Sequence, residues 1–213
     1  PLVGLVMGVD LLANNSAQLD ADEIAGAAHS ASHSAHRLSD AINDIIRFME
    51  APALARLSQG FALSNLAALL EAIRSDLQLP AVPIEFDPAV SAAALLLSVN
   101  AVELIMRELL ENARKFHPRQ QPQVLVTVRR LDAQRAVLRV IDDGRTLPAE
   151  ELARAWTPYF QGEKDFTGQL AGMGLGLAMV ASLVWEAGGA CRLFNRPDGP
   201  GVVVELILPV SNG

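Results

Sequence analysis

The sequence predicts an α+β fold in which a helical hairpin precedes an α/β sandwich. In the amino-terminal quarter, apolar residues recur at alternating spacings of four and three, a pattern typical of a helix that packs against other helices. The later part combines segments of helical period with short runs of branched residues, which are typical of strands. We therefore expect helices on one face of a mixed sheet after the hairpin.

The helical hairpin is expected over residues 1–55. Its first helix carries a short apolar stripe at Leu2, Leu5, Val9 and Leu12, which ends at the loop signal Ala13-Asn-Asn-Ser16. Its second helix carries the longer pattern, at Ile24, Ala28, Ala31, Ala35, Leu38, Ile42, Ile45 and Met49. One hairpin cannot bury this seam alone, so we expect a homodimer that forms a four-helix bundle. The alternative is that the hairpin packs against the rest of its own chain.

The second domain is expected over residues 60–213, after a junction that begins at Ala51-Pro52. The spacing of apolar residues gives its elements in order. They are a helix at 64–77, a strand at 82–86, helices over 89–116, a hairpin of 123–130 with 136–141, a loop of about 145–171, a helix at 174–187 and a final hairpin of 190–195 with 202–208.

Two polar side chains in the helical segment before residue 116 indicate a site for a hard cation. Glu108 and Asn112 are four residues apart and therefore lie on one helix face. A carboxylate and an amide oxygen suit a cation that prefers oxygen ligands and keeps several waters. Arg114 and Lys115 lie a turn further on, within reach of a phosphate. Taken alone, the same residues also fit a solvated polar stripe.

Two glycine-containing segments follow in a fixed order. Asp142-Asp-Gly144 ends the strand expected at 136–141, where an aspartate can accept a hydrogen bond from an exocyclic amine, although alone it reads as a turn. Gly172-Met-Gly174-Leu-Gly176 precedes an apolar helical run, and bare backbone amides at the start of a helix attract phosphate. Its spacing differs from the dinucleotide-binding pattern Gly-x-Gly-x-x-Gly. Together, the ordered segments indicate a pocket for ATP and magnesium.

On these segments, residues 60–213 resemble the ATP-binding domain of bacterial sensor histidine kinases, within the superfamily that also contains gyrase, Hsp90 and MutL. The resemblance implies an ATP-binding α/β sandwich of the Bergerat type. Residues 108–118 resemble the N box of this family, Trp156-Thr-Pro-Tyr-Phe160-Gln resembles its F box, and residues 172–177 resemble its second glycine box.

The resemblance also implies a role for each matching residue. Asn112 is the implied magnesium ligand, and Glu108 is the implied catalytic residue that orients the metal or the attacking group. The residues implied to bind ATP are Asn112, Lys115, Asp142, Gly144, Phe160, Gly172, Gly174 and Gly176. One position departs from the family, because Thr146 replaces the second glycine of the first glycine box. A β-branched residue resists positive φ, so we expect an altered loop or weaker nucleotide binding.

The hairpin resembles the dimerisation domain of the same kinases. Residues 37–46 resemble its second helix, and Pro1-Leu-Val-Gly-Leu5 resembles the sequence that follows the phosphoacceptor histidine, which we therefore expect just upstream of Pro1. The implied function is a protein-histidine kinase that uses Mg-ATP to phosphorylate that histidine. The phosphate would then pass to an aspartate in the receiver domain of a response regulator. In a rival register, His36 belongs to a degenerate phosphoacceptor motif.

Two other functions stay open. A degenerate protein of this fold would act as a docking platform or a phosphotransfer intermediate without phosphorylating, and Thr146 favours this alternative. An ATPase of the gyrase or Hsp90 type would instead use Glu108 to activate water and would release phosphate to solvent.

Composition restricts the partners and the location that we expect. The formal net charge of −7 disfavours nucleic acid and anionic membranes as partners. No apolar run approaches the ~20 residues of a membrane span. We expect this segment to be cytoplasmic, with a membrane anchor possible only elsewhere in a longer parent protein. His29, His33 and His36 share one helix face, a spacing that suits a transition metal or, more simply, a polar flank.

Overall fold

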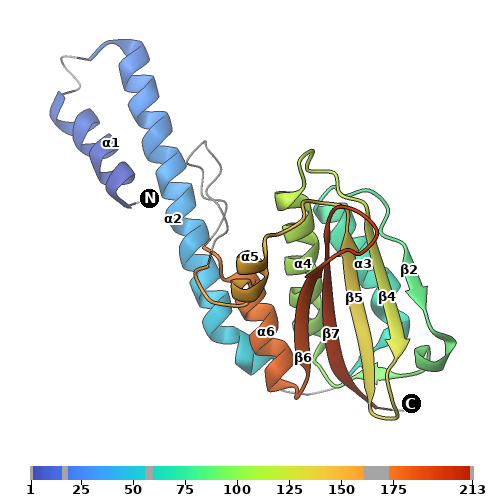
Figure 1. Ribbon diagram of the computed structural model, residues 1–213. Helices are drawn as coiled ribbons and strands as arrows, with labels where there is room; N and C mark the ends of the chain where they lie inside the picture. The colour runs from blue at the N-terminus through green and yellow to red at the C-terminus, as the bar shows by residue number, and fades with distance from the viewer. Residues whose placement is uncertain (1, 16–18, 56–59, 161–172, 212–213) are drawn as a thin grey trace. The chain divides into compact units, whose positions relative to one another are not determined.

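The computed structural model describes residues 2–15, 19–55, 60–160 and 173–211 (Figure 1). The chain divides into two compact units, one up to Arg47 and one from Phe48 onward. The first unit contains α1 (Leu2–Asn15) and most of α2 (Ala21–Ala55). The last residues of α2 belong to the second unit. The remaining elements are β1 (Phe61–Ala62), η1 (Leu63–Asn65), α3 (Leu66–Asp76), β2 (Ile84–Phe86), η2 (Pro88–Val90), β3 (Ala94–Leu95), α4 (Val99–Phe116), β4 (Val124–Arg130), β5 (Arg135–Asp142), α5 (Ala149–Arg154), α6 (Gly176–Glu186), β6 (Ala190–Asn195) and β7 (Val202–Ser211).

The first unit is the predicted helical hairpin. The helices α1 and α2 approach closely because their contact is made of small residues: a Cβ added to Gly8 would lie 3.0 Å from the Cβ of Ala31. The start of α2 is fixed by a capping box, in which Glu23 N donates to Asp20 Oδ1 at 2.8 Å and Asp20 N donates to Glu23 Oε2 at 3.0 Å.

The apolar residues that repeat every seven positions along α2 are partly buried and partly exposed. Ala31 is buried, and Ile24, Leu38 and Ile45 are partly buried. The alternate members Ala28, Ala35 and Ile42 are exposed, the last with 49% of its surface accessible. The hairpin therefore buries one half of each seven-residue repeat and leaves the other half uncovered.

The second unit is built on a mixed seven-stranded sheet. Its strand order is β1-β3-β7-β5-β4-β2, and β6 pairs with the other side of β7. All pairings are antiparallel except that of β2 with β4. The helices α3, α4 and α6 cover one face of the sheet (Figure 1). This arrangement confirms the predicted α+β sandwich.

The core lies between these helices and the inward-facing side chains of the central strands. Ser98 caps α4 by accepting a hydrogen bond from Ala101 N at 3.1 Å, so the helix begins at Val99. Its apolar face, which includes Met106 and Leu110, is fully buried against the sheet. The core also includes Ala51, near the end of α2, which explains why the second unit begins inside that helix.

Several predicted element bounds were wrong. The expected helices over 89–116 contain only one α-helix, since η2 and β3 occupy the first part of that range. The helix expected from residue 174 begins at Gly176, because Gly174 has φ +71°. In the expected loop of 145–171, the structure contains α5. The helix α2 continues past Pro52 to Ala55.

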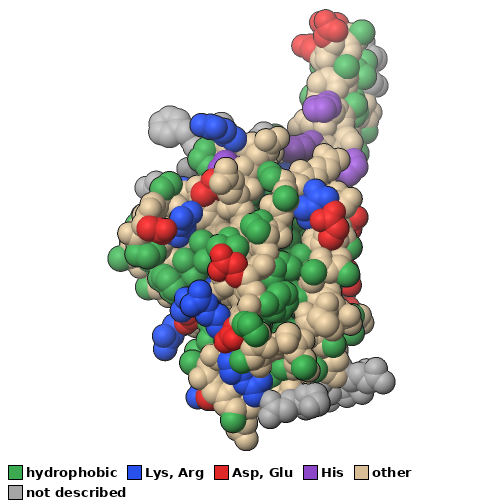
Figure 2. Space-filling view, turned by 90° about the vertical axis from the view of Figure 1, so that its right-hand side faces the viewer, with side chains coloured by type: hydrophobic (Ala, Val, Ile, Leu, Met, Phe, Trp, Pro, Cys, Tyr) green, Lys and Arg blue, Asp and Glu red, His purple; other side chains and the backbone are tan. Residues whose placement is uncertain are grey.

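Charged side chains of both signs are interspersed on the surface shown in Figure 2, which also shows histidines on the helical hairpin. The carboxylate of Glu205 in β7 is buried instead and pairs with Arg139 of β5, with 2.7 Å between Oε2 and Nη2. His29, His33 and His36 are exposed on α2. No helix in the described ranges is long and apolar enough to cross a membrane. Burial raises the pKa of the partly buried Cys191 thiol to about 12, so this thiol stays protonated and unreactive at neutral pH.

Candidate functional site

Glu108 and Asn112 lie beside the amino-terminal end of α6. A Cβ added to Gly176 would collide with Oε2 of Glu108 and would lie 3.7 Å from Nδ2 of Asn112. The missing side chain of Gly176 therefore leaves room for both polar groups next to the first backbone amides of α6. The N box and the second glycine box, which lie far apart in the sequence, meet here as predicted.

The second glycine box also contacts the F box. Tyr159 N donates a hydrogen bond to the carbonyl oxygen of Gly174 at 3.0 Å. A Cβ at Gly174 would collide with the carbonyl oxygen of Phe160, and its φ of +71° also favours glycine. The ring of Phe160 lies 4.4 Å from the guanidinium carbon of Arg154, measured to the ring centroid. Gly172 lies outside the described residues.

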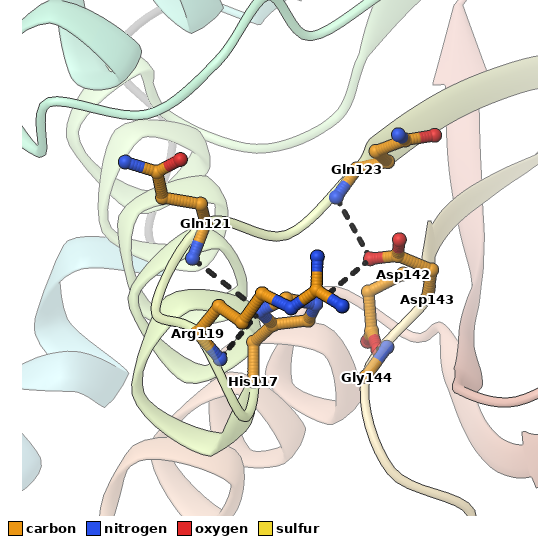
Figure 3. Close-up of polar contacts among 7 residues, drawn as sticks. All are labelled: His117, Arg119, Gln121, Gln123, Asp142, Asp143 and Gly144. Atoms are coloured by element: carbon orange, nitrogen blue, oxygen red, sulfur yellow. Dashed lines mark hydrogen bonds and ion pairs between the residues drawn. The ribbon is translucent and has the colours of Figure 1, made fainter.

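Asp142 is the last residue of β5 and is buried (Figure 3). Its Oδ1 accepts a hydrogen bond from Gly144 N at 2.8 Å. Burial raises the pKa of the Asp142 carboxyl, an effect that the backbone N–H groups of Gly144 and Val202 oppose. The turn thus holds a buried carboxylate whose charge is only partly compensated, as a group that recognises a polar ligand requires.

Gly201 is a residue of this site that sequence reasoning missed. It has φ +105°, and a Cβ there would collide with the carbonyl oxygen of Asp142. The turn between β6 and β7 therefore packs directly on the Asp142 turn. The only signal in the sequence was the run Asp198-Gly-Pro-Gly201, which predicts a turn but not what the turn contacts.

The two cationic residues after Asn112 have different environments. Lys115 is exposed, with Nζ 5.2 Å from the ring centroid of Phe116. Arg114, which we expected within reach of a phosphate, donates instead to the carbonyl oxygen of Leu77 at 2.9 Å. Arg114 therefore connects α4 with the end of α3, and Lys115 is the better candidate to contact phosphate.

Thr146 does not have a positive φ, the backbone conformation that would strain a β-branched residue. The non-glycine residues with positive φ in the described part of the chain are Gln78, Gln120 and Tyr159. The neighbours of Thr146 hold the loop, because Arg145 pairs with Glu151 at 2.6 Å and Leu147 exchanges two hydrogen bonds of 2.8 Å with the side chain of Asn195. Strain at Thr146 is therefore no reason to expect weaker nucleotide binding.

The donor set at Glu108 and Asn112 fits one class of metal. Among the residues that the structure describes, no three His, Cys, Asp or Glu side chains are placed to hold an ion. One carboxylate and the amide oxygen of one asparagine suit a cation that takes its other ligands from water and phosphate, as magnesium does. The site therefore fits magnesium bound together with a nucleotide.

Comparison with known proteins shows the family to which this chain belongs. Residues 98–212 match the family model described as "Histidine kinase-, DNA gyrase B-, and HSP90-like ATPase". The chain is 37% identical over 117 residues to the "Non-motile and phage-resistance protein" of Caulobacter vibrioides, a match that covers 53% of the chain and 13% of that protein. It is 35% identical over 88 residues to "Sensor histidine kinase ZraS" of Klebsiella oxytoca, which covers 41% of the chain and 18% of that protein.

Solved structures share the fold. The structure described as "ShkA full-length in complex with AMPPNP" aligns with a TM-score of 0.64 and 23% identity over 100% of this chain and 44% of that one. The two curated relatives are much longer than this chain, since its matches cover less than a fifth of each.

Proposed function

The chain belongs to the histidine kinase-, DNA gyrase B- and HSP90-like ATPase family and contains the ATP-binding domain of a sensor histidine kinase; from this we propose that it binds Mg-ATP between α4, α6 and the Asp142 turn. The observation that carries the proposal is the meeting of Glu108 and Asn112 with Gly176. We assign the ATP-binding domain to residues 60–213 and the dimerisation and phosphotransfer hairpin to residues 1–55.

The triphosphate and its cation belong at the amino-terminal end of α6. Asn112 would hold magnesium through its amide oxygen, with Glu108 beside it. The backbone amides at Gly174 and Gly176 and the ammonium group of Lys115 offset the phosphate charge. When bound, magnesium neutralises charge on the phosphate oxygens. Because Gly176 has no side chain, the phosphates can approach the backbone of α6 closely.

The adenine belongs at the Asp142 turn. The Asp142 carboxylate accepts a hydrogen bond from the exocyclic amine, and Gly144 leaves room for the base. A carboxylate at this depth forms a strong hydrogen bond, since water competes poorly there. Phe160, whose carbonyl oxygen lies next to Gly174, would contribute to the edge of the pocket.

The reaction that we propose is phosphoryl transfer to a histidine of the helical dimerisation domain. An imidazole nitrogen attacks the γ-phosphorus. The N–P bond forms as the bond to the β–γ bridging oxygen breaks, and ADP leaves with that electron pair. Glu108 orients the imidazole and accepts its proton. The phosphoryl group then passes to an aspartate in the receiver domain of a response regulator.

The direct test is calorimetric titration of a non-hydrolysable ATP analogue into this chain, with and without magnesium, together with an assay of phosphate release from ATP. We expect magnesium-dependent binding and little release, because a histidine kinase transfers the γ-phosphate to an imidazole rather than to water. Steady release would favour the gyrase-type ATPase. The absence of binding would favour the docking protein. Thr146 no longer supports that alternative, because its backbone is not strained.

We also propose that the hairpin forms a homodimer. The exposed half of its seam, at Ala28, Ala35 and Ile42, runs along α2 at seven-residue intervals. The helix α1 adds exposed apolar side chains, among them Val3 and Met7 with 72% and 67% of their surfaces accessible. A second copy that packs in a four-helix bundle would cover this surface.

Ile42→Asp should weaken the homodimer by about a hundredfold, because a charge would be placed in the new interface without a partner. Since Ile42 is exposed within its own hairpin, the substitution should leave the single chain folded. Sedimentation equilibrium measures the association, and His33→Asp, on the opposite side of the same helix, is the control. An Ile42→Asp variant as dimeric as His33→Asp would show that dimers form through another surface.

A further inference from the structure

The imidazole of His117 connects three segments of the pocket. His117 follows the last residue of α4 and is its C-cap. Its Nδ1 lies 3.2 Å from Arg119 N and 3.3 Å from Gln121 N, and its Nε2 lies 3.5 Å from Asp143 Oδ1 (Figure 3). Because backbone N–H groups only donate, Nδ1 accepts both of these bonds. The proton is therefore on Nε2, next to the Asp143 carboxylate.

Asp143 is shared between His117 and the beginning of β4. Its Oδ1 also accepts a hydrogen bond from Gln123 N at 2.8 Å. The side chain of Asp143 is 29% exposed and that of His117 is 11% exposed, so water screens this contact only in part. The backbone is close as well, since a Cβ at Gly144 would lie 3.9 Å from the Cα of His117. The end of α4, the start of β4 and the turn after β5 thus meet at one imidazole.

We propose that His117 is a positioning residue for adenine recognition. By holding Asp143, it fixes the turn in which the preceding residue, Asp142, presents its carboxylate to the exocyclic amine. It also joins this turn to α4, the helix that carries Asn112, so that the base and the cation are positioned from the same element. The inference rests on the adenine-binding role proposed for Asp142.

The contact between His117 and Asp143 does more than cap the loop after α4, because Asp143 is next to a second carboxylate. Asp142 and Asp143 follow each other in the chain, and their like charges repel at close range. An N–H donor at Asp143 draws that carboxylate towards α4 and away from the base. Without it, Asp143 keeps only the bond from Gln123 N among those the structure records here. The turn then loses its connection to α4, and the Asp142 carboxylate loses its fixed orientation.

The two nitrogens of His117 can be tested separately with amide side chains. The Oδ1 atom of an asparagine can take the place of Nδ1 and accept the bonds from Arg119 N and Gln121 N, but its side chain is too short to reach Asp143. The amide nitrogen of a glutamine can take the place of Nε2 and donate to Asp143. His117→Asn therefore keeps the loop cap alone, whereas His117→Gln keeps the donor to Asp143.

The experiment compares affinities for a non-hydrolysable ATP analogue and for inosine triphosphate, which carries a carbonyl in place of the exocyclic amine. Thermal unfolding of each variant is recorded alongside. We expect His117→Asn to unfold close to the wild-type temperature and to lose about five- to tenfold of the preference for adenine over inosine. His117→Gln should recover most of that preference. Asp143→Ala should lose it to the same extent, with no further loss in the double variant His117→Asn/Asp143→Ala.

A His117→Asn variant that keeps the wild-type preference would overturn the proposal, whether its unfolding temperature is unchanged or lowered. In either case His117 would act on the loop alone. Additive losses in the double variant would also overturn it. If the wild-type chain itself binds both nucleotides equally, the role assigned to Asp142 fails, and this inference fails with it. If the wild type prefers adenine and His117→Asn keeps that preference, the role of Asp142 stands and only the role of His117 is rejected.

Discussion

Asn112→Ala should remove the magnesium-dependent part of the affinity for ATP and leave the fold intact. The side chain of Asn112 is only partly buried and faces Gly176, so its loss opens no cavity in the core. Alanine also favours the helical conformation more than asparagine does. Loss of a metal ligand should lower nucleotide affinity in magnesium by about a hundredfold or more, since even residues that only support metal ligands contribute about 10–100-fold.

Calorimetric titration with and without magnesium measures this effect, and circular dichroism confirms the fold. The matched control is Asn100→Ala, an exposed asparagine in the first turn of the same helix, which should bind nucleotide as the wild type does. If Asn112→Ala retains the full difference between the two titrations, magnesium is held elsewhere.

Asp142→Asn should weaken ATP binding and at the same time stabilise the protein. A neutral amide oxygen accepts a weaker hydrogen bond than a carboxylate, and the difference corresponds to about 10–100-fold in affinity for adenine nucleotides. The affinity for GTP, which has no exocyclic amine at that position, should change much less. The exposed Asp198 in the turn between β6 and β7 offers the control substitution Asp198→Asn. Equal losses for ATP and GTP would reject the adenine-reading role.

The gain in stability from Asp142→Asn follows from the raised pKa of the Asp142 carboxyl, which burial causes. A carboxyl group with a raised pKa in the folded state binds protons more tightly there than in the unfolded chain. The wild type therefore loses stability as the pH rises from the ordinary range of an aspartate through the raised pKa. The variant lacks this loss and should melt a few degrees higher at neutral pH, and the difference should shrink on acidification. Thermal melts across this pH range measure it.

The long elements could be predicted from the sequence because their period is sustained. The helix around Met106 and Leu110, and the strands that pair Val126 with Val140 and Val140 with Val204, repeat their patterns over whole elements. The strands β1 and β3 contain only two residues each, too few to show a period. The apolar run at 92–99 reads as helix for that reason, although Leu95 pairs with Val210 at the end of β7.

The candidate site could be predicted in its parts but not in its connections. The spacing of Glu108 and Asn112 predicts a shared helix face, and the family resemblance predicts that the glycine boxes lie near it. No pattern in the sequence places Gly201 against Asp142, or His117 against Asp143, because these contacts depend on how separate turns pack. The same holds for Arg114, whose bond to the carbonyl oxygen of Leu77 is fixed by the packing of α3 on α4.

The contact between Gly176 and Glu108 also constrains how this sequence can change over evolutionary time. A side chain at position 176 would occupy the space that now holds Oε2 of Glu108. A side chain there would displace the flexible end of Glu108 from this space, and a shorter residue at 108 would remove the carboxylate beside Asn112. Neither position can change first without loss, so the two are expected to be inherited as a pair in lineages that keep the reaction.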